Sequence, residues 1–315
     1  MAGSSTALAA PMPSVRLGIL QFGTVQWVAD IIRRNGLDSA NHFALTTTLL
    51  ANTDAGRVAL MANAADIVVS DWMFVAVQRA AGTKLCFAPF SSSTGGVMTS
   101  KSSPIHSLAD LAHRKLGVAG GPVDKSWLMV RAAAKKAAGI DLAEAADVVF
   151  GAPPLLNAKL MQGELDAVLT YWNFAARLEA ADYRRVISVD DCARGLGLPS
   201  SMSLVGFVFH EEWAKRDPAT INGFLTATSL AEDSLAKSSV EWRQIRPLMN
   251  APDDRLFQRL REGFVQGVSH PDAATQERAA TRLFDVLLQT GGPRATQGLS
   301  QLPPGIFWPP SALNG

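Results

Sequence analysis

Short apolar runs alternate with longer helical patterns along this chain, and the alternation limits its fold more than any other feature. "VRLGIL" precedes a predicted helix over 24–35, "ALTTTLL" precedes one over 54–62, and "ADIVVSD" precedes one over 72–81. Strand-length runs followed by helical spacing predict βαβ units and a parallel sheet. We therefore predict an α/β protein.

The pattern restarts once, which predicts a second lobe. After "KLCFAPF" and "GGVMTS", further strand-like runs precede predicted helices over 126–138, 154–162 and 174–181. The stretch "CARGLGLPSSMS" is typical of a connection, because it is rich in Gly, Pro and Ser. A chain of 315 residues also exceeds one average domain.

Charge and hydropathy exclude two classes of partner. The net charge is +1, with 29 basic and 28 acidic residues and no long run of either sign, so the footprint of a nucleic-acid-binding protein is absent. Apolar runs such as 67–69 and 205–209 are broken long before they reach the length of a membrane span. A charged ligand must therefore be met by local groups.

The N-terminus has a feature of exported proteins. Ala7-Leu8-Ala9 has the small-x-small form of a signal-peptidase site, although no basic and apolar regions precede it. We interpret it as the remainder of a trimmed signal peptide. A plain Ala/Ser-rich terminus remains the alternative.

The two cysteines, Cys86 and Cys192, are too few for a zinc site built from two pairs. A single disulfide between them is possible. The apolar surroundings of Cys86 in "KLCFAPF" favour a buried free thiol.

Four segments follow one another in a recognisable order. The first two are "ADIVVSDWMFVAVQRAAG" and "SSPIHSLADLAHRKLGVAGGPVDKSW". The others are "AKLMQGELDAVLTYWNFAARLEA" and "FHEEWAKRDPATINGFLTATSLA". Taken in order, they resemble the periplasmic substrate-binding proteins of ABC importers, in the branch that serves nitrate, sulfonates, taurine and thiamine precursors, with His113 in place of the usual glycine. The similarity extends from Val15 to about His270, and it is the ordered set that carries it.

The resemblance implies a type II periplasmic binding protein, with two α/β lobes that close on a ligand between them. We expect lobe 1 to comprise 14–97 and 202–315, and lobe 2 to comprise 98–201, with crossings near Gly95 and Ser201. The family also implies a non-catalytic, monomeric, periplasmic protein that works with an ABC permease and an ATPase. Delivery of a cofactor without a transporter remains an alternative.

The turn "GVAGGPVDKSW" is the strongest candidate for a binding loop. Ligands of open α/β sheets bind at the carboxyl ends of strands, where helix N-termini present unpaired N–H groups. Gly120 and Gly121 would let the backbone approach a ligand closely, while Asp124 or Ser126 caps the following helix. Lys125 would then reach into the cleft, although a plain turn with a solvated lysine is the simpler interpretation.

Trp27, Trp72, Trp127 and Trp172 each follow a strand-like run, at the loops expected to line the cleft. Tryptophan usually fills cores, but four at equivalent positions indicate a ligand with a flat face. The remaining predicted ligand-binding residues are mostly polar and occupy the same loops: Gln21, Thr24, Ser70, Asp71, Ser92, Thr94, Gly121, Lys125, Ser126, Tyr171, Asn173 and Arg177. Asp71 and Asp124 would repel an anion unless they cap helices, and Arg177 is the only expected cationic helper.

A tryptophan-lined cleft with one lysine resembles the members of this family that bind pyrroloquinoline quinone. Indoles would stack on the fused rings, amides and hydroxyls would hold the carboxylates, and Lys125 would contact a quinone carbonyl. A sulfonate or a thiamine-precursor pyrimidine is the alternative ligand.

An enzyme of the same fold that acts on pyridoxal phosphate through Lys125 is a further alternative. Against it, the five histidines are scattered and no catalytic triad is evident in the sequence.

Overall fold

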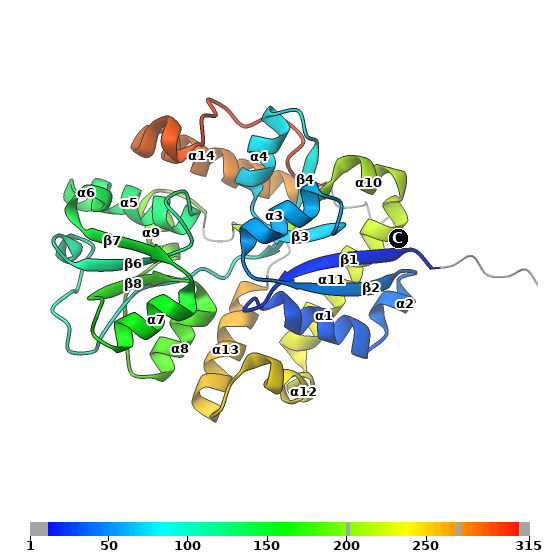
Figure 1. Ribbon diagram of the computed structural model, residues 1–315, viewed down its shortest axis with the longest axis horizontal. Helices are drawn as coiled ribbons and strands as arrows, with labels where there is room; N and C mark the ends of the chain where they lie inside the picture. The colour runs from blue at the N-terminus through cyan, green and yellow to red at the C-terminus, as the bar shows by residue number, and fades with distance from the viewer. Residues whose placement is uncertain (1–11, 200–201, 269–271, 309–315) are drawn as a thin grey trace, which may run out of the picture.

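The computed structural model describes residues 12–199, 202–268 and 272–308 and has two lobes, each built on a five-stranded sheet (Figure 1). The first sheet has the order β2-β1-β3-β10-β4 and the second β7-β6-β8-β5-β9. The strands of the first sheet are β1 (Ser14–Leu20), β2 (Ala44–Leu50), β3 (Ile67–Ser70), β4 (Leu85–Ser91) and β10 (Val205–His210). Those of the second are β5 (Gly96–Thr99), β6 (Lys115–Ala119), β7 (Asp147–Gly151), β8 (Ala167–Thr170) and β9 (Arg184–Ser188).

Helices connect and cover the strands. The helices between β1 and β4 along the chain are α1 (Val25–Arg34), α2 (Leu37–Ala40), α3 (Thr53–Met61) and α4 (Trp72–Ala80). The second lobe has the 3₁₀ helix η1 (Ala109–Leu111), α5 (Lys125–Ala138), α6 (Leu142–Ala145), α7 (Pro153–Met161), α8 (Trp172–Ala180) and α9 (Val189–Gly195). After β10 follow α10 (Glu211–Arg216), α11 (Pro218–Lys237), α12 (Ser239–Met249), α13 (Asp254–Gly267) and α14 (Ala273–Ala295).

Short polar side chains begin many of these helices. Asn52 accepts a hydrogen bond from the N–H of Ala55 at the start of α3, and Asp253 accepts one from Leu256 at the start of α13. Each bond satisfies one of the donors that a helix N-terminus leaves unpaired. These caps set where the helices begin after each strand.

The strands of the predicted βαβ units pair in parallel, β1 with β2 and β3, and β6 with β7 and β8, but one crossing strand makes each sheet mixed. β10 runs antiparallel to β3 and β4, between which it lies. β5 runs antiparallel to β8 and β9. Each of these strands enters its sheet from the other lobe, and a crossing strand need not follow the direction that a βαβ connection imposes.

The first sheet is buried on both faces, and its side chains alternate between two cores. Ile67 and Val69 pack in a core with α1, α11 and α12. Val68, between them, packs in a second core with α4 and α14. That second core continues into the other lobe, where it includes Leu116 of β6 and Trp127 of α5. The two lobes therefore share apolar packing in this conformation.

The two helices nearest the C-terminus pack against the second lobe. α13 packs against α8 of the second lobe, and α14 packs against α5 of the same lobe. Figure 1 shows α14 along one side of the molecule, next to α5 and close to α4. α14 is interrupted at Gly292, whose φ of 61° lies outside the helical region, directly before Pro293.

The lobe boundaries expected from the sequence remain a prediction, since α13 and α14, which we expected in lobe 1, pack against α8 and α5 of the second lobe. Ser201, the expected return point, and the candidate cleavage site at residues 7–9 lie outside the described residues. Among the described helices, none has the length and apolar character that crossing a bilayer requires.

Candidate functional site

The carboxyl ends of strands from the two sheets face each other across the boundary between the lobes. β3 of the first sheet ends at Ser70 and leads through Asp71 into α4. β6 of the second sheet ends at Ala119 and leads through a short turn into α5. This is the place where open α/β sheets bind ligands, next to helix N-termini.

The turn before α5 depends on Gly120. Its φ is +89°, which favours glycine, and a Cβ placed there would lie 2.9 Å from Tyr171 Oη and 3.0 Å from Asp124 Oδ2. Asp124 Oδ1 accepts hydrogen bonds from the backbone N–H groups of Ser126 and Trp127, at 2.9 and 3.3 Å. Asp124, one of the two predicted caps, therefore begins α5 and leaves Lys125 as its first residue.

Lys125 joins the lobes through an ion pair with Asp71, at 2.8 Å between Nζ and Oδ1. Arg57 of α3 binds the other carboxylate oxygen, at 2.8 Å between Nη2 and Oδ2. We call Arg57, Asp71 and Lys125 the cleft ion cluster. Asp71 and Lys125 are 7% and 8% exposed, so solvent screens their attraction little.

Asp71 has two roles at once. Its Oδ1 accepts the N–H of Phe74 at 2.9 Å, which caps α4 and meets the condition under which we expected Asp71 to be compatible with an anion. Burial alone would raise its pKa, but the charges of Lys125 and Arg57 outweigh burial and hold the pKa below its usual range. The carboxylate is therefore ionised at neutral pH.

Asp124 and Tyr171 complete the polar lining. Burial raises the pKa of Asp124, and the nearby Asp71 adds to that shift. Burial, together with Asp124 and Asp71, raises the pKa of the Tyr171 phenol far above its usual range. Tyr171 thus remains a neutral hydroxyl, able to donate or accept a hydrogen bond.

Two buried polar atoms at the same strand ends have no hydrogen-bond partner within the described ranges. They are Nε1 of Trp72, at the start of α4, and Oγ1 of Thr170, at the end of β8. Both residues are at most 2% exposed. Buried groups without partners are uncommon and costly, so they are candidates for contact with a ligand or water.

The four predicted indoles do not line one slot in this conformation. Trp72 and Trp127 lie in the core shared with α14, at 0% and 1% exposed. Trp27 is 3% exposed in the other core, with Trp242 and Phe264 around its ring. Only Trp172 is partly buried, and its ring meets that of Trp27 edge to face, with 6.1 Å between centroids. The rings mainly fill cores, as tryptophan usually does.

The predicted polar residues divide between the cluster and the contacts that join the lobes. Ser70 is buried and accepts a hydrogen bond from Arg57, at 3.3 Å. Asn173 of α8 donates to the carbonyl oxygen of Phe22 in the other lobe, at 3.2 Å. Gly121 and Ser126 are partly buried in the turn before α5 and in its first turn.

Other predicted residues contact the protein itself. Ser92 bonds to the carbonyl oxygen of Gly267 through both its N–H and its hydroxyl, and Thr94 bonds to the side chain of Asp190. Gln21 is exposed, and Thr24 begins α1 without a side-chain bond.

Arg177 does not assist Lys125, contrary to our expectation. Its guanidinium donates to the carbonyl oxygens of Met249 and Asn250, at the C-terminal end of α12. Unpaired carbonyl oxygens at a helix end attract a cation. Arg57 takes the role expected of Arg177. Arg57 lies in α3, the helix that follows β2. In the sequence, this place soon after a strand was the only signal that Arg57 could belong to the site.

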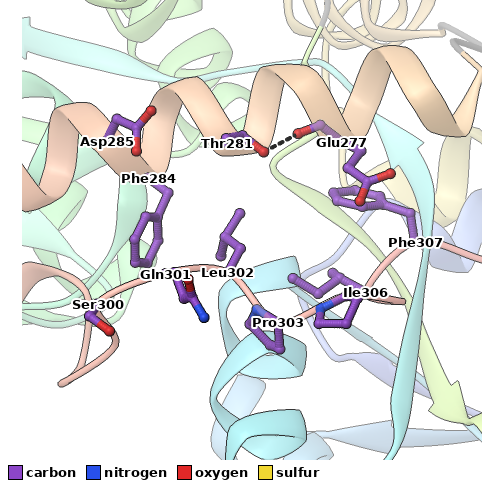
Figure 2. A pocket seen from close by; sticks show the side chains of 11 residues that line it. Glu277, Thr281, Phe284, Asp285, Ser300, Gln301, Leu302, Pro303, Ile306 and Phe307 are labelled. Atoms are coloured by element: carbon purple, nitrogen blue, oxygen red, sulfur yellow. Dashed lines mark hydrogen bonds between the residues drawn. The ribbon is translucent and has the colours of Figure 1, made fainter.

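Two cavities open elsewhere, on α14. One of about 330 Å³ lies between α14 and the C-terminal segment, where Phe284, Leu302, Ile306 and Phe307 surround it with Glu277 at its edge (Figure 2). A second of about 220 Å³ lies between α14 and α5. Neither is lined by a predicted site residue.

The cysteines are buried free thiols, so the prediction for Cys86 is confirmed and a disulfide is absent. Burial raises the pKa of Cys86 to about 11 and that of Cys192 to about 12, so both remain thiols at neutral pH. Over residues 12–199, 202–268 and 272–308 no group of His, Cys, Asp and Glu is arranged to hold a metal ion.

Comparisons with known proteins fit this architecture. The family described as "NMT1/THI5 like" matches residues 45–238, more than half of the chain. No curated protein matches the sequence.

Three solved structures illustrate the likeness in fold. The periplasmic aliphatic sulphonate binding protein SsuA from Escherichia coli has a TM-score of 0.74 and 17% identity over 97% of this chain and 95% of that one. The periplasmic nitrate-binding protein NrtA from Synechocystis PCC 6803 has a TM-score of 0.62 and 11% identity, covering 94% and 92%. The desulfurization enzyme DSZB has a TM-score of 0.60 and 13% identity, covering 92% and 96%. The expected two-lobed binding-protein fold is thus confirmed.

Proposed function

Because the chain belongs to the NMT1/THI5-like family, we propose that it is a solute-binding protein that captures a small organic oxyanion between its lobes for import. The similar fold of two periplasmic binding proteins, for aliphatic sulphonates and for nitrate, supports this proposal. Its place of action would be the periplasm, and its partners an ABC permease and an ATPase.

The observation that carries the proposal is the pair of cations at the facing strand ends. Lys125 comes from one lobe and Arg57 from the other, and both contact one carboxylate group at 2.8 Å. A sulfonate presents oxygens of the same charge, and charge-assisted hydrogen bonds to such oxygens are the strong ones. Two hydroxyls come from the end of β8, in the sheet whose strand β6 precedes Lys125: the neutral one of Tyr171, and that of Thr170, which has no partner among the described residues.

A small ligand suits this site better than a large planar one. Pyrroloquinoline quinone would need exposed indole faces, and Trp27, Trp72 and Trp127 are enclosed by apolar side chains. A sulfonate needs only donors and a modest apolar contact. We keep the quinone as the large-ligand alternative in the test below.

An amine-bearing heterocycle is the second candidate. Asp71 and Asp124 place two carboxyl groups beside Lys125, and a pyrimidine with an exocyclic amine would donate to them. This candidate shares the cleft with the first but would contact the carboxyl groups of Asp71 and Asp124 instead of the cations.

We propose a non-catalytic role for the cleft. The amine of Lys125 is held by Asp71, whereas formation of an imine would require that amine to be free to attack a carbonyl carbon. The similarity to the desulfurization enzyme concerns the fold, which hosts more than one activity.

Replacing Lys125 by methionine should weaken binding of ethanesulfonate by about tenfold to a hundredfold, the usual value of a hydrogen bond to a charged group. Titration calorimetry on the purified protein measures this effect. The same panel should contain nitrate, a 4-aminopyrimidine and pyrroloquinoline quinone.

Lys136→Met is the matched control, because Lys136 is an exposed lysine of the same helix that bonds only to the carbonyl oxygen of Gly195 among the contacts described. Its affinity should equal that of the unmodified protein. Equal affinity of the Lys125 variant would remove the proposed oxyanion site, and tighter binding of the quinone than of ethanesulfonate would favour the larger ligand.

A further inference from the structure

The ion pair between Lys125 and Asp71 occupies the position that the proposed ligand would take. Asp71 follows β3 in the first sheet, and Lys125 begins α5 beyond β6 in the second. Their side chains are each 10% exposed, so both charges are largely shielded from water where the lobes meet. A charge that has left water must be paired, and here the partner comes from the opposite lobe.

We propose, on the basis of the function above, that Asp71 is an internal competitor for the oxyanion. Its carboxylate holds Lys125 and Arg57 when no ligand is present and so keeps the lobes closed. An arriving oxyanion must displace Asp71 from these two cations. Asp71 therefore sets both the resting conformation and the affinity for anions.

The position of Lys125 supports this assignment. A lysine in the first turn of a helix lies at the positive end of the helix dipole, where a cation is unfavourable. Asp124 offsets part of that cost, since its charge attracts Lys125, but its carboxylate is also the cap of α5. The remaining stabilisation comes across the cleft, from Asp71.

Arg57 would stay in place when Asp71 leaves. Its Nη1 also contacts Asp54 at 3.1 Å, and its guanidinium lies 4.8 Å from the centre of the Phe74 ring. These contacts are within the same lobe. An oxyanion that enters would therefore find one cation already positioned and a second one, Lys125, released by the displaced carboxylate.

Asp71→Asn tests the proposal, because asparagine keeps the size of the side chain and its ability to cap α4 while it removes the charge. Lys125 would then be buried beside a neutral group, and opening of the lobes would return it to water. We expect a larger radius of gyration for the ligand-free variant than for the unmodified protein, by small-angle X-ray scattering. We also expect ethanesulfonate to bind about tenfold tighter, because the ligand no longer has to displace a charged carboxylate from Lys125 and Arg57.

Asp141→Asn is the matched control. Asp141 also caps a helix, α6, and binds an arginine, Arg131, through both carboxylate oxygens at 2.9 and 2.6 Å. Both partners of that pair lie in one lobe, so its loss should leave the scattering curve and the affinity unchanged.

The outcomes separate this inference from the proposed function. If the Asp71→Asn variant scatters like the unmodified protein, Asp71 does not keep the lobes closed, and the inference is overturned even if both proteins bind ethanesulfonate. If the variant opens but neither protein binds ethanesulfonate, the role of Asp71 in holding the lobes together is supported, and the proposed oxyanion ligand is refuted. If Asp71→Asn does not fold, Lys125→Gln breaks the same ion pair from the other lobe. We expect this variant to open the lobes without a gain in affinity for ethanesulfonate. A Lys125→Gln variant that stays closed also refutes the proposal.

Discussion

Replacing Gly95 by alanine should lower the free energy of unfolding by about 3 kcal/mol or more, at the upper end of overpacking costs. A Cβ at this position would lie 1.7 Å from the carbonyl oxygen of Thr170 and 2.8 Å from its carbonyl carbon. Both are backbone atoms, so no side-chain rotation relieves the overlap. β5, which begins at Gly96 and pairs with β8, would have to move away from its neighbour.

Gly195→Ala is the control for this prediction. Gly195 ends α9, is exposed, and has no atom within 4 Å of an added Cβ. Alanine there should be neutral or slightly stabilising, because it reduces the freedom of the unfolded chain. Urea denaturation of both variants gives the comparison, and similar midpoints would show that the contact between β5 and Thr170 is looser than described.

Replacing Glu232 by glutamine should stabilise the protein at alkaline pH by up to about 5 kcal/mol and change little at acidic pH. Glu232 lies on α11 and is 3% exposed, and burial raises its pKa to about 8 from 4.5. The folded state therefore favours the neutral carboxyl. Its contribution is fully present below about pH 4.5 and is lost as the pH rises through about 8, because folding must then bury a charge or bind a proton.

Chemical denaturation at pH 5 and at pH 9 measures this difference. Asp233→Asn is the comparison, since it removes a neighbouring carboxylate whose side chain is 47% exposed and whose charge is the smaller cause of the raised pKa of Glu232. This variant keeps Glu232, so its stability should still fall between pH 5 and pH 9, and its difference from the unmodified protein should change much less with pH than that of Glu232→Gln. A stability difference between Glu232→Gln and the unmodified protein that is the same at both pH values would contradict the shifted pKa.

Local patterns predicted most of the elements because the signals are short-range. The run "ALTTTLL" is β2 over the same residues, Ala44–Leu50, and the helix expected over 72–81 is α4 at Trp72–Ala80. Strand alternation and helix caps depend on a few neighbouring residues, which the sequence displays directly. The antiparallel placement of β5 and β10 depends on crossings between lobes and leaves no such local pattern.

The sequence predicted which loops form the candidate site, but it did not predict which of their side chains pair with one another. Gly120, Asp124 and Lys125 have the positions expected from one short segment. The pairing of Lys125 with Asp71 joins residues that are far apart in sequence, and it follows only from how the two sheets face each other. Arg57 escaped prediction for the same reason.

The tryptophans illustrate a limit of reasoning from position alone. A residue just after a strand can point toward the cleft or back into the core beneath the helix, and both directions satisfy the same sequence pattern. Trp27 lies in the first turn of α1 and packs against Trp242 of α12 and Phe264 of α13. Apolar burial of an indole then outweighs its exposure in a cleft.

The position of β10 between β3 and β4 determines the order in which the lobes can be completed. The second sheet draws all its strands from one continuous segment, 96–188. The first sheet keeps a gap beside β3 until residues 205–210 insert, so its completion depends on long-range contacts and is slow. β1, β2 and β3 therefore precede every strand of the second sheet along the chain and yet belong to the sheet that is completed last.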